Sequence, residues 1–321
     1  MISFIYKSKS KYRLGGAVVA GEKFKNSLIE NGISLKSFSY SIGNLNILGI
    51  LKDSFFRKNT AIWNLSTYSI HKFFILIFLS SYIKKKIIIR FFGSDQVIAY
   101  KNNIVIRKIF NILFLRNIYF MFETKECEFF FSNIYKKTYF FPNFIKVNKK
   151  VNFKDKTYKR KFIYVGMISS EKGVDLILEF LFRNSKFKCD FYGPIYKNYN
   201  IKNKYDLIWK KSYKGIVKNE ELINIYSKYD FTILPSFKEG YPNTVLESLN
   251  QGTPLILSNI NSLIEMIDKS AIFVDLNYES FEKEILNITN YQLKKMKKNI
   301  KFDLNKYNCD HVVGRFIKDM L

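Results

Sequence analysis

The segment FTILPSFKEGYPNTVLESLNQGTPLILS, residues 231–258, contains the strand–helix–strand pattern on which the fold prediction rests. FTILPS and PLILS have the composition of buried strands. Residues 242–251 between them predict a helix that begins at Pro242 and stops at Gly252, because proline suits the first helical position and glycine the C-terminal end. The segment therefore predicts two parallel strands joined by a helical crossover.

The same alternation runs through the rest of the chain. Strands are expected in the first half at 2–6, 34–40, 61–65, 86–92, 118–122 and 137–141. In the second half they are expected at 161–166, 189–193, 231–236, 254–258 and 271–274. Helices are expected at 17–32 and at about 174–184, 219–228, 242–251 and 261–268.

This order predicts an α/β protein with two Rossmann-like doubly wound domains that face a central cleft. The N-terminal domain is expected at 1–150 and the C-terminal domain at 151–305, with a final helix in 306–321 packing back on the first domain. Residues 146–161 are polar and charged without helical periodicity, so we interpret them as the linker. Ligands of such domains bind beyond the carboxyl ends of the strands.

The chain is strongly basic, with a formal net charge of +26. Residues 1–150 hold 25 Lys and Arg against 7 Asp and Glu, a balance of +18, and the remainder holds 28 against 20, a balance of +8. A basic surface attracts anionic partners such as nucleic acid, lipid headgroups or phosphate-bearing substrates. A compositional bias explains much of the total charge but explains the difference between the halves less well.

The cysteine and histidine content excludes several kinds of active site. Three cysteines without paired spacing predict a reducing compartment, and two histidines are too few for His-based triads or His-rich metal sites. The N-terminal segment is not typical of a signal peptide, and the most apolar run, residues 73–79, is too short to span a bilayer. We expect a cytoplasmic protein, with a peripheral position at the inner face of the plasma membrane left open.

Two glutamates flank the predicted helix start in FKEGYPNTVLES, residues 237–248. The first turn of a helix offers backbone N–H groups and the positive end of the helix dipole, which suit a phosphate. Glu239 precedes the helix and Glu247 lies inside it. Carboxylates next to a bound diphosphate are suited to accept hydrogen bonds from the hydroxyls of an attached sugar or ribose. Taken alone, the pair is better explained as acids that a helix dipole favours.

A second loop follows the strand at 161–166, in FIYVGMISSEKGVD, residues 162–175. The strand ends at Gly166, Lys172 lies where it could reach a phosphate, and Gly173 allows the backbone to approach a ligand. Ser-Ser-Glu is equally a helix start without a ligand. This loop alone is a weak signal.

Two further loops lie in the first half. Gly15 and Gly16 join the first strand to the first helix, where an anion site and a simple turn fit about equally well. Asp95 follows the apolar strand at 86–92, where it is either a substrate ligand or a helix cap.

Five motifs, in this order and spacing, resemble those of family 4 glycosyltransferases. They are RLGGA at 13–17, FFGSD at 91–95, FPNFI at 141–145, VGMISSEKGVD at 165–175 and FKEGYPNTVLESLNQGTPLILS at 237–258. Members of that family are retaining enzymes with two Rossmann-like domains, the GT-B fold. The resemblance is strongest between about residue 160 and residue 275, and its most specific element is the Glu-x7-Glu motif.

The resemblance implies a role for each matched residue. Glu239 would contact hydroxyls of the donor sugar, Glu247 would bind the ribose, and Lys172 would neutralise the departing diphosphate, so Lys172 and Glu239 are the expected catalytic residues. The expected donor-binding residues are Gly15, Gly16, Gly166, Lys172, Glu239, Gly240, Tyr241, Pro242, Asn243, Thr244, Val245 and Glu247. The resemblance implies no metal and no cofactor, because a lysine and a helix start take the place of a divalent cation. The co-substrate would be a UDP- or GDP-sugar.

Two positions depart from the family pattern. A basic residue usually follows Val-Gly, but here the residue is Met167, and Arg13 is the candidate for the missing cationic contact. Histidine often precedes the glycine of the first-domain loop, but here the residue is Phe92. The Phe92 departure concerns the family's usual contact to the donor sugar. We assign Arg13 and Asp95 to acceptor or sugar binding.

The resemblance implies a retaining glycosyltransferase that acts on a glycan or lipid-linked glycan in bacterial surface polysaccharide synthesis, such as O-antigen or capsule. Residues 104–117 combine basic and apolar side chains at helical spacing, which fits either peripheral contact with an anionic membrane or a core helix with a solvated basic side. Two alternatives remain, a sugar-nucleotide-binding scaffold without catalysis and a basic nucleic-acid-binding protein. The second lacks any nucleic-acid-binding motif, so we expect no nucleic-acid partner.

Overall fold

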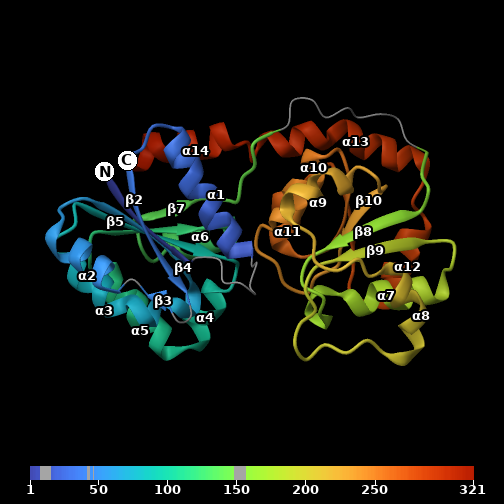
Figure 1. Ribbon diagram of the computed structural model, residues 1–321, viewed down its shortest axis with the longest axis horizontal. Helices are drawn as coiled ribbons and strands as arrows, with labels where there is room; N and C mark the ends of the chain where they lie inside the picture. Colours follow the sequence, from blue (N-terminus) through green and yellow to red (C-terminus); the bar gives the residue numbers. More distant parts are fainter. Residues whose placement is uncertain (8–15, 42–43, 46, 148–156) are drawn as a thin grey trace. The chain divides into compact units, whose positions relative to one another are not determined.

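The computed structural model describes residues 1–7, 16–41, 44–45, 47–147 and 157–321, which form two compact units (Figure 1). Unit 1 consists of Met1–Asn143 together with Cys309–Leu321, and unit 2 consists of Phe144–Asn308. The chain therefore changes unit at Asn143, before the position of 150 suggested by the sequence, because Ile145 already pairs with Asn308 of unit 2. Residues 148–156 of the predicted linker lie outside the described residues.

The sheet of unit 1 has the strand order β3-β2-β1-β4-β5-β6-β7. All neighbouring strands are parallel except β3, which runs antiparallel to β2. The strands are β1 (Ile2–Lys7), β2 (Leu35–Ser41), β3 (Asn44–Leu45), β4 (Thr60–Ser66), β5 (Lys86–Phe92), β6 (Ile118–Phe122) and β7 (Thr138–Phe140).

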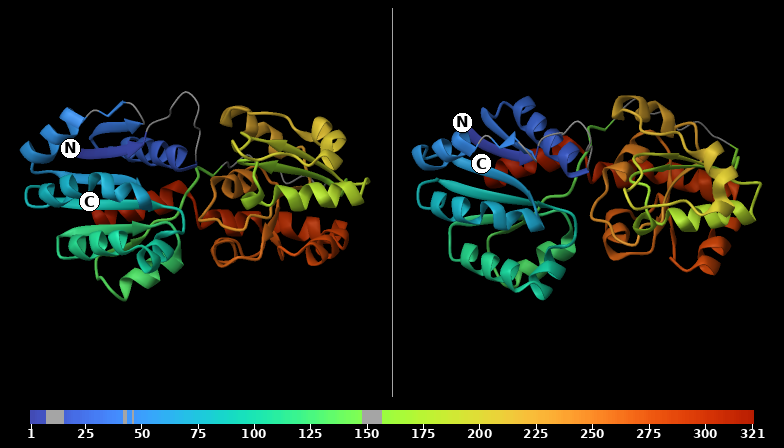
Figure 2. Two further views of the ribbon diagram at one scale, coloured as in Figure 1. Left: turned by 90° about the horizontal axis from the view of Figure 1, so that it is seen from below. Right: turned by 60° about the horizontal axis from the view of Figure 1, so that its bottom comes forward.

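Helices cover both faces of this sheet. On one face, α1 (Gly16–Glu30) and the C-terminal α14 (Cys309–Met320) lie side by side, and the rings of Phe24, Phe141 and Phe316 pack together beneath them (Figures 1 and 2). The other face packs Trp63, Phe110 and further buried apolar residues under its helices. Those helices are α2 (Ile47–Phe56), α3 (Ile70–Ser80), α4 (Gln96–Asn102), α5 (Ile104–Phe114) and α6 (Lys125–Ser132).

The sheet of unit 2 is parallel throughout, with the order β12-β11-β10-β8-β9. Its strands are β8 (Lys161–Val165), β9 (Lys188–Tyr192), β10 (Phe231–Leu234), β11 (Leu255–Ser258) and β12 (Ala271–Val274). Its helices are α7 (Val174–Arg183), α8 (Asp206–Ser212), α9 (Asn219–Tyr226), α10 (Asn243–Asn250), α11 (Asn261–Met266), α12 (Tyr278–Leu286) and α13 (Asn290–Asn305). None of the described helices in either unit is both long enough and apolar enough to cross a bilayer.

Both sheets are doubly wound, which confirms the predicted fold class. In unit 1 the strand order reverses between β1 and β4, and in unit 2 it reverses between β8 and β10. Ligands of open α/β sheets bind outside the carboxyl ends of the strands at such a reversal. The loops that follow β8 and β10 are therefore the place in unit 2 where the fold itself favours a ligand.

The helix start near Pro242 differs from the prediction. Pro242 has φ −67° and ψ 133°, so its backbone is extended and it caps α10 rather than forming its first residue. The helix begins at Asn243. The first backbone N–H groups of the helix thus belong to the residues that follow the proline, and the proline fixes the direction from which the loop enters.

Glu179 on α7 holds the segment before α8 in place, and this ion-pair cluster makes stability depend on pH. Its carboxylate accepts from Lys204 Nζ at 2.5 Å, from Arg183 Nε at 2.7 Å and from the Tyr205 hydroxyl. The bonds from Lys204 and Tyr205 lower the pKa of Glu179 from 4.5 to about 2. A lowered folded-state pKa means that the cluster stabilises the fold above pH 4.5, and that this contribution disappears as the pH falls toward 2.

We expect Glu179→Gln to lower the melting temperature at pH 7, with a difference from wild type that shrinks between about pH 5 and pH 2. Thermal melts over this pH range measure the effect. Glu284→Gln, at an exposed position on α12, is the matched control and should behave as wild type throughout. If the melting temperature of Glu179→Gln stays below that of wild type by the same amount at every pH, the ion-pair account is contradicted.

Candidate functional site

Lys172 and Glu239 meet at the strand-order reversal of unit 2. Lys172 ends the 3-10 turn η2 (Ser170–Lys172) after β8, and Glu239 lies in the loop after β10. Lys172 Nζ lies 2.7 Å from Glu239 Oε1 and 3.2 Å from the carbonyl oxygen of Lys238. The Lys172 side chain is 27% exposed and that of Glu239 11% exposed, so both are partly screened from water yet accessible from outside. The structure thus brings together the two residues that the sequence assigned to catalysis.

Gly173 allows the two loops to approach this closely. Its φ is +70°, and a Cβ at this position would lie 2.0 Å from the carbonyl oxygen of Pro235. The backbone N–H of Phe237 donates to the carbonyl of Glu171 at 2.9 Å, which joins the loops a second time. No residue other than glycine fits there without moving one loop, because the obstacle is backbone rather than a side chain.

The start of α10 lies against the end of β8. Thr244 Oγ1 donates to the carbonyl of Val165, the last residue of β8, at 3.3 Å. Val245 is buried, whereas Asn243 and Thr244 are half-buried. The first turn of α10 therefore lies next to the loop that carries Lys172, where its N–H groups and dipole add to the positive potential of the lysine.

Glu247 lies on α10 one turn beyond Asn243 and is half-buried. The Tyr226 hydroxyl donates to Glu247 Oε2 at 3.4 Å. Burial raises the pKa of Tyr226 well above its usual value, so the phenol stays neutral and remains a donor. Tyr226 therefore orients the carboxylate that the resemblance assigns to the ribose.

Sequence reasoning missed Tyr226 and Ser262. Ser262, on α11, donates from its hydroxyl to the backbone carbonyl of Glu239 at 2.8 Å and so holds the loop from a third strand–helix connection. Neither residue carries a signal in the sequence, because a tyrosine on an amphipathic helix and a serine near a helix start are both common without a ligand. Only the tertiary contacts identify them.

Gly166 and Met167 stand at the end of β8. A Cβ on the neighbouring Gly193, whose φ is +138°, would lie 1.9 Å from the Gly166 carbonyl oxygen, so the two strand ends are in contact. The Met167 side chain is 44% exposed, and its backbone carbonyl accepts from the buried Tyr164 hydroxyl at 2.7 Å. Met167 therefore occupies the place of the family's basic residue with an exposed thioether and contributes no charge.

Gly240 and Tyr241 complete the loop after β10. Gly240 is half-buried, whereas Tyr241 is fully buried with its ring edge-on to Tyr307 and its hydroxyl 3.4 Å from Glu265 Oε2. The Tyr241 side chain thus anchors the loop to the core, and only its backbone is available to a ligand.

Two of the residues predicted in unit 1 are described. Gly16 begins α1, and no described atom lies within 4 Å of its Cβ position. Asp95 takes the N-cap position of α4, but its side chain makes no capping bond and accepts instead from Thr67 Oγ1 at 2.6 Å and Gln96 Nε2 at 3.1 Å. Asp95 therefore braces the loop that follows β4. Arg13 and Gly15 lie outside the described residues.

A buried polar network supports the loop that contains Phe92. Arg90 is fully buried, donates to Asn143 Oδ1 at 3.0 Å and lies 4.8 Å from the Phe92 ring centroid. Glu123 accepts from Asn143 Nδ2 and from the Gly93 N–H, both at 2.9 Å. Burial lowers the pKa of Arg90 to about 10, opposed by the charge of Glu123. The partly buried ring of Phe92 thus packs against the guanidinium of Arg90 and offers no polar group to a ligand.

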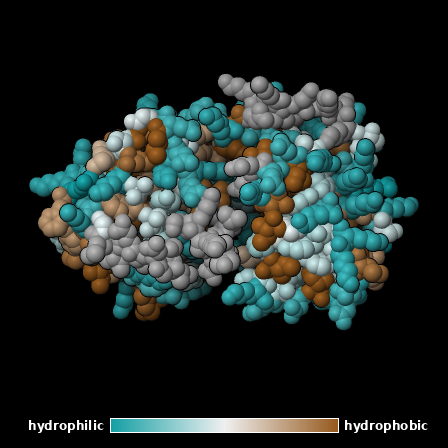
Figure 3. All heavy atoms as spheres, in the orientation of Figure 1, coloured by the Kyte–Doolittle hydropathy of each residue, from teal (hydrophilic) through white to brown (hydrophobic). Residues whose placement is uncertain are grey.

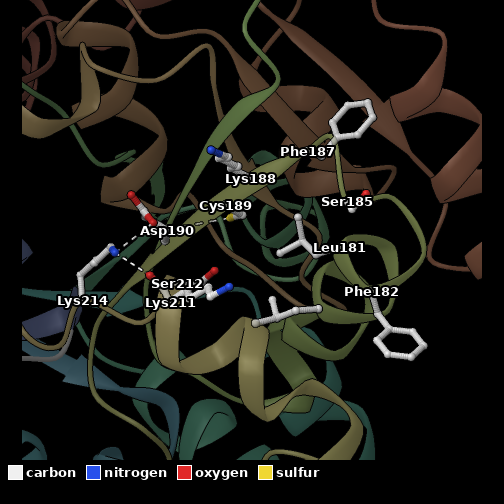
Figure 4. Close-up of a pocket in the computed structure, with 11 residues that line it drawn as sticks. Leu181, Phe182, Ser185, Phe187, Lys188, Cys189, Asp190, Lys211, Ser212 and Lys214 are labelled. Carbon is white, nitrogen blue, oxygen red and sulfur yellow. Dashed lines mark hydrogen bonds and ion pairs between the residues drawn. The ribbon is translucent and has the colours of Figure 1, made fainter.

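A pocket of about 650 Å³ lies elsewhere in unit 2, along the first half of β9 (Figure 4). Leu181 and Cys189 line its apolar part, and Lys214 at its rim is 3.4 Å from Asp190. None of the residues predicted for the site lines this pocket. Within the described parts of the chain, no group of three or more His, Cys, Asp or Glu side chains is placed to hold a metal ion.

The matches to known proteins fit this geometry. Residues 145–302 match the family model described as glycosyl transferases group 1. The match spans nearly all of unit 2 and includes both loops of the site. Unit 2 thus has the sequence pattern of a group 1 glycosyltransferase.

One curated relative is the O-antigen biosynthesis glycosyltransferase WclY of Escherichia coli, 30% identical over 115 residues, which is 35% of this chain and 32% of WclY. The chain spans less than half the length of each curated relative it matches.

Solved structures extend the likeness to both units. HepE from Anabaena in complex with UDP-glucose has a TM-score of 0.73 and 10% identity, with 99% of this chain and 98% of that chain covered. Sucrose-phosphate synthase from Thermosynechococcus elongatus has a TM-score of 0.71 and 12% identity, with 99% and 97% covered. At such low identity the likeness shows the fold alone. The chain has the GT-B fold.

Proposed function

We propose that this chain is a retaining, metal-independent glycosyltransferase of the group 1 type that moves a sugar from a nucleoside-diphosphate sugar to a hydroxyl of a glycan. The observation that carries the proposal is the Lys172–Glu239 pair, 2.7 Å apart at the strand-order reversal and beside the start of α10. A donor of this class joins its sugar directly to its β-phosphate. A cation for the phosphate and a carboxylate for the sugar hydroxyls must therefore also be adjacent.

In the proposed reaction, the bond between C1 of the sugar and the β-phosphate oxygen breaks, and the acceptor oxygen bonds to C1 on the same face. The electron pair of the broken bond stays on the phosphate. Lys172 and the first turn of α10 stabilise this charge, and the leaving phosphate takes the proton of the acceptor hydroxyl. Each group stabilises the transition state more than the ground state, because the negative charge grows as the bond breaks.

Glu247 would bind the ribose hydroxyls and so hold the nucleotide at the far side of the helix start. Its carboxylate is half-buried and accepts from the neutral Tyr226 hydroxyl, and a carboxylate is suited to accept hydrogen bonds from a diol. The remaining proposed donor contacts are the backbone of Gly16, Gly166, Gly240, Tyr241, Pro242, Asn243, Thr244 and Val245, together with Gly15.

Relatives suggest the setting. WclY is named as an O-antigen biosynthesis enzyme, and HepE was solved with UDP-glucose. We therefore propose a UDP- or GDP-sugar donor and an acceptor glycan, free or lipid-linked, of a bacterial surface polysaccharide made in the cytoplasm at the inner face of the plasma membrane. Arg13 and Asp95 are proposed for the acceptor side. No observation favours the scaffold or nucleic-acid alternatives.

An assay of nucleoside-diphosphate release from UDP- and GDP-sugars tests the proposal, with the anomeric configuration of the product followed by NMR. We expect one donor to be turned over with retained configuration and equal rates with and without EDTA. An inverted product would refute the retaining mechanism, and loss of turnover in EDTA would refute metal independence. The absence of turnover with every donor and acceptor tried, together with the absence of donor binding, would refute the function.

A further inference from the structure

Two neighbouring helices of unit 1 expose apolar side chains toward solvent. On α3, Ile75 and Leu79 stand one turn apart and are 69% and 42% exposed. On α5 and the residue that follows it, Ile104, Ile112 and Leu115 recur at helical spacing and are 57%, 39% and 83% exposed. In Figure 3, apolar atoms stand among hydrophilic ones at the edge of unit 1 where Figure 1 draws α3 and α5. We call these five residues the α3–α5 face.

The ends of the two helices are fastened to one another. Arg116, just beyond α5, donates from Nε to Ser81 Oγ at 2.9 Å, and its guanidinium lies 3.6 Å from the ring centroid of Tyr82. Both partners follow the end of α3. Buried residues such as Ile77 and Phe110 turn the opposite sides of the helices into the core. The exposed stripes therefore belong to a single rigid surface and not to independent loops.

The charge around this face has one sign. Lys72 on α3 and Arg107 and Lys108 on α5 are exposed beside the apolar residues. Residues 47–117 contain twelve Lys and Arg but two acids, Asp53 and Asp95. Asp53 is buried and pairs with the buried Lys84 at 2.8 Å, and Asp95 lies at the N-cap of α4, so neither acid belongs to the α3–α5 face.

We propose that the α3–α5 face docks on the surface of an anionic lipid bilayer. Apolar side chains that enter the headgroup region and basic ones that meet lipid phosphates are the two contributions to interfacial binding of amphipathic helices. A second copy of this chain would bring two basic faces together, and like charges disfavour that contact. A nucleic acid would satisfy the charge but would offer no apolar environment for Ile112 or Leu115.

Co-sedimentation with vesicles tests this interface, using the full chain without any sugar nucleotide. We expect binding to vesicles of phosphatidylglycerol and phosphatidylcholine in equal parts, and little binding to phosphatidylcholine alone. Ile112→Ser with Leu115→Ser should lower the partition coefficient by about tenfold or more, through loss of apolar insertion. Arg107→Glu with Lys108→Glu should lower it at least as much, and the remaining binding should be less sensitive to salt.

Matched controls come from unit 2. Leu286→Ser replaces a leucine that is 49% exposed, between Ile112 and Leu115, and Lys295→Glu with Lys298→Glu reverses two exposed lysines on α13. Both should bind vesicles as wild type does, and melting temperatures should show that every variant is folded.

Two outcomes would overturn the proposal. One is equal vesicle binding by the α3–α5 variants and the control variants, and the other is wild-type binding that is the same with and without phosphatidylglycerol. A dimer in solution that the α3–α5 substitutions dissolve would assign the face to a second copy instead. Because no donor is present, the outcome is independent of the proposed transfer reaction.

Discussion

Lys172→Ala is expected to lower kcat by about 10²–10³-fold while changing the dissociation constant of the donor far less. Lys172 Nζ is anchored by Glu239 and the Lys238 carbonyl, so its charge is positioned before the reaction begins. Such a preorganised group stabilises the charge that develops on the leaving phosphate more than the charge already present in the bound donor. Steady-state kinetics together with calorimetric donor binding separate the two effects.

Lys238→Ala is the matched control, because this lysine is exposed in the same loop and contributes only its backbone carbonyl to Lys172. It should keep nearly wild-type kcat. Equal losses of turnover and of donor affinity in Lys172→Ala would contradict a leaving-group role and would make Lys172 a simple binding residue.

Gly173→Ala is expected to destabilise unit 2 by about 4 kcal/mol or more, which is exceptional for one methyl group. Its positive φ costs about 1–2 kcal/mol for any L-residue, and the new Cβ would also lie 2.0 Å from the Pro235 carbonyl oxygen. Relief of that clash requires the loop after β8 to move away from the loop after β10. Donor binding should therefore fall together with the melting temperature.

Gly215→Ala separates the two causes. Gly215 has φ +78° and nothing within 4 Å of its Cβ position. This substitution should therefore lower the free energy of unfolding only by the cost of a positive φ, about 1–2 kcal/mol. Thermal and urea unfolding of both variants gives the comparison. Similar losses for Gly173→Ala and Gly215→Ala would show that the loops do not touch as described.

The strand pattern was predictable because the inner strands are apolar and buried on both faces, as in β10 and β11, where every residue is buried. The predicted strands KIIIRFF at 86–92 and AIFV at 271–274 coincide with β5 and β12, because a short apolar run between polar segments is typical of a strand in a parallel sheet. The sequence pattern gave no range for α2, α3, α4 and α6 of unit 1 or for α8, α12 and α13 of unit 2. In α13, five of the sixteen residues are lysines, and the buried side combines the apolar Leu293, Ile300 and Leu304 with the charged Lys297 and Asp303, which weakens the helical pattern of apolar residues.

The sequence predicted the loops that form the candidate site, but it did not predict the contacts between these loops. The pattern placed Lys172 and Glu239 at the ends of two strands, but their pairing depends on β8 and β10 being neighbours, which the order along the chain does not determine. The supporting Tyr226 comes from a helix whose sequence indicates only an amphipathic core contact. Site residues that act through backbone geometry, such as Gly173, were recognised as permissive without the reason, which is the Pro235 carbonyl.

Thermal melting of wild type and Glu247→Ala with UDP-, GDP- and ADP-sugars tests the nucleotide-sugar site most directly. A ligand at about 100 times its Kd stabilises the folded state by about 2.7 kcal/mol. We predict that one sugar nucleotide raises the melting temperature of wild type by several degrees, in line with a stabilisation of about 2.7 kcal/mol. Glu247→Ala should lose most of that shift because the ribose loses its acceptor, whereas Glu284→Ala should keep it. No stabilisation of wild type by any sugar nucleotide would contradict the account.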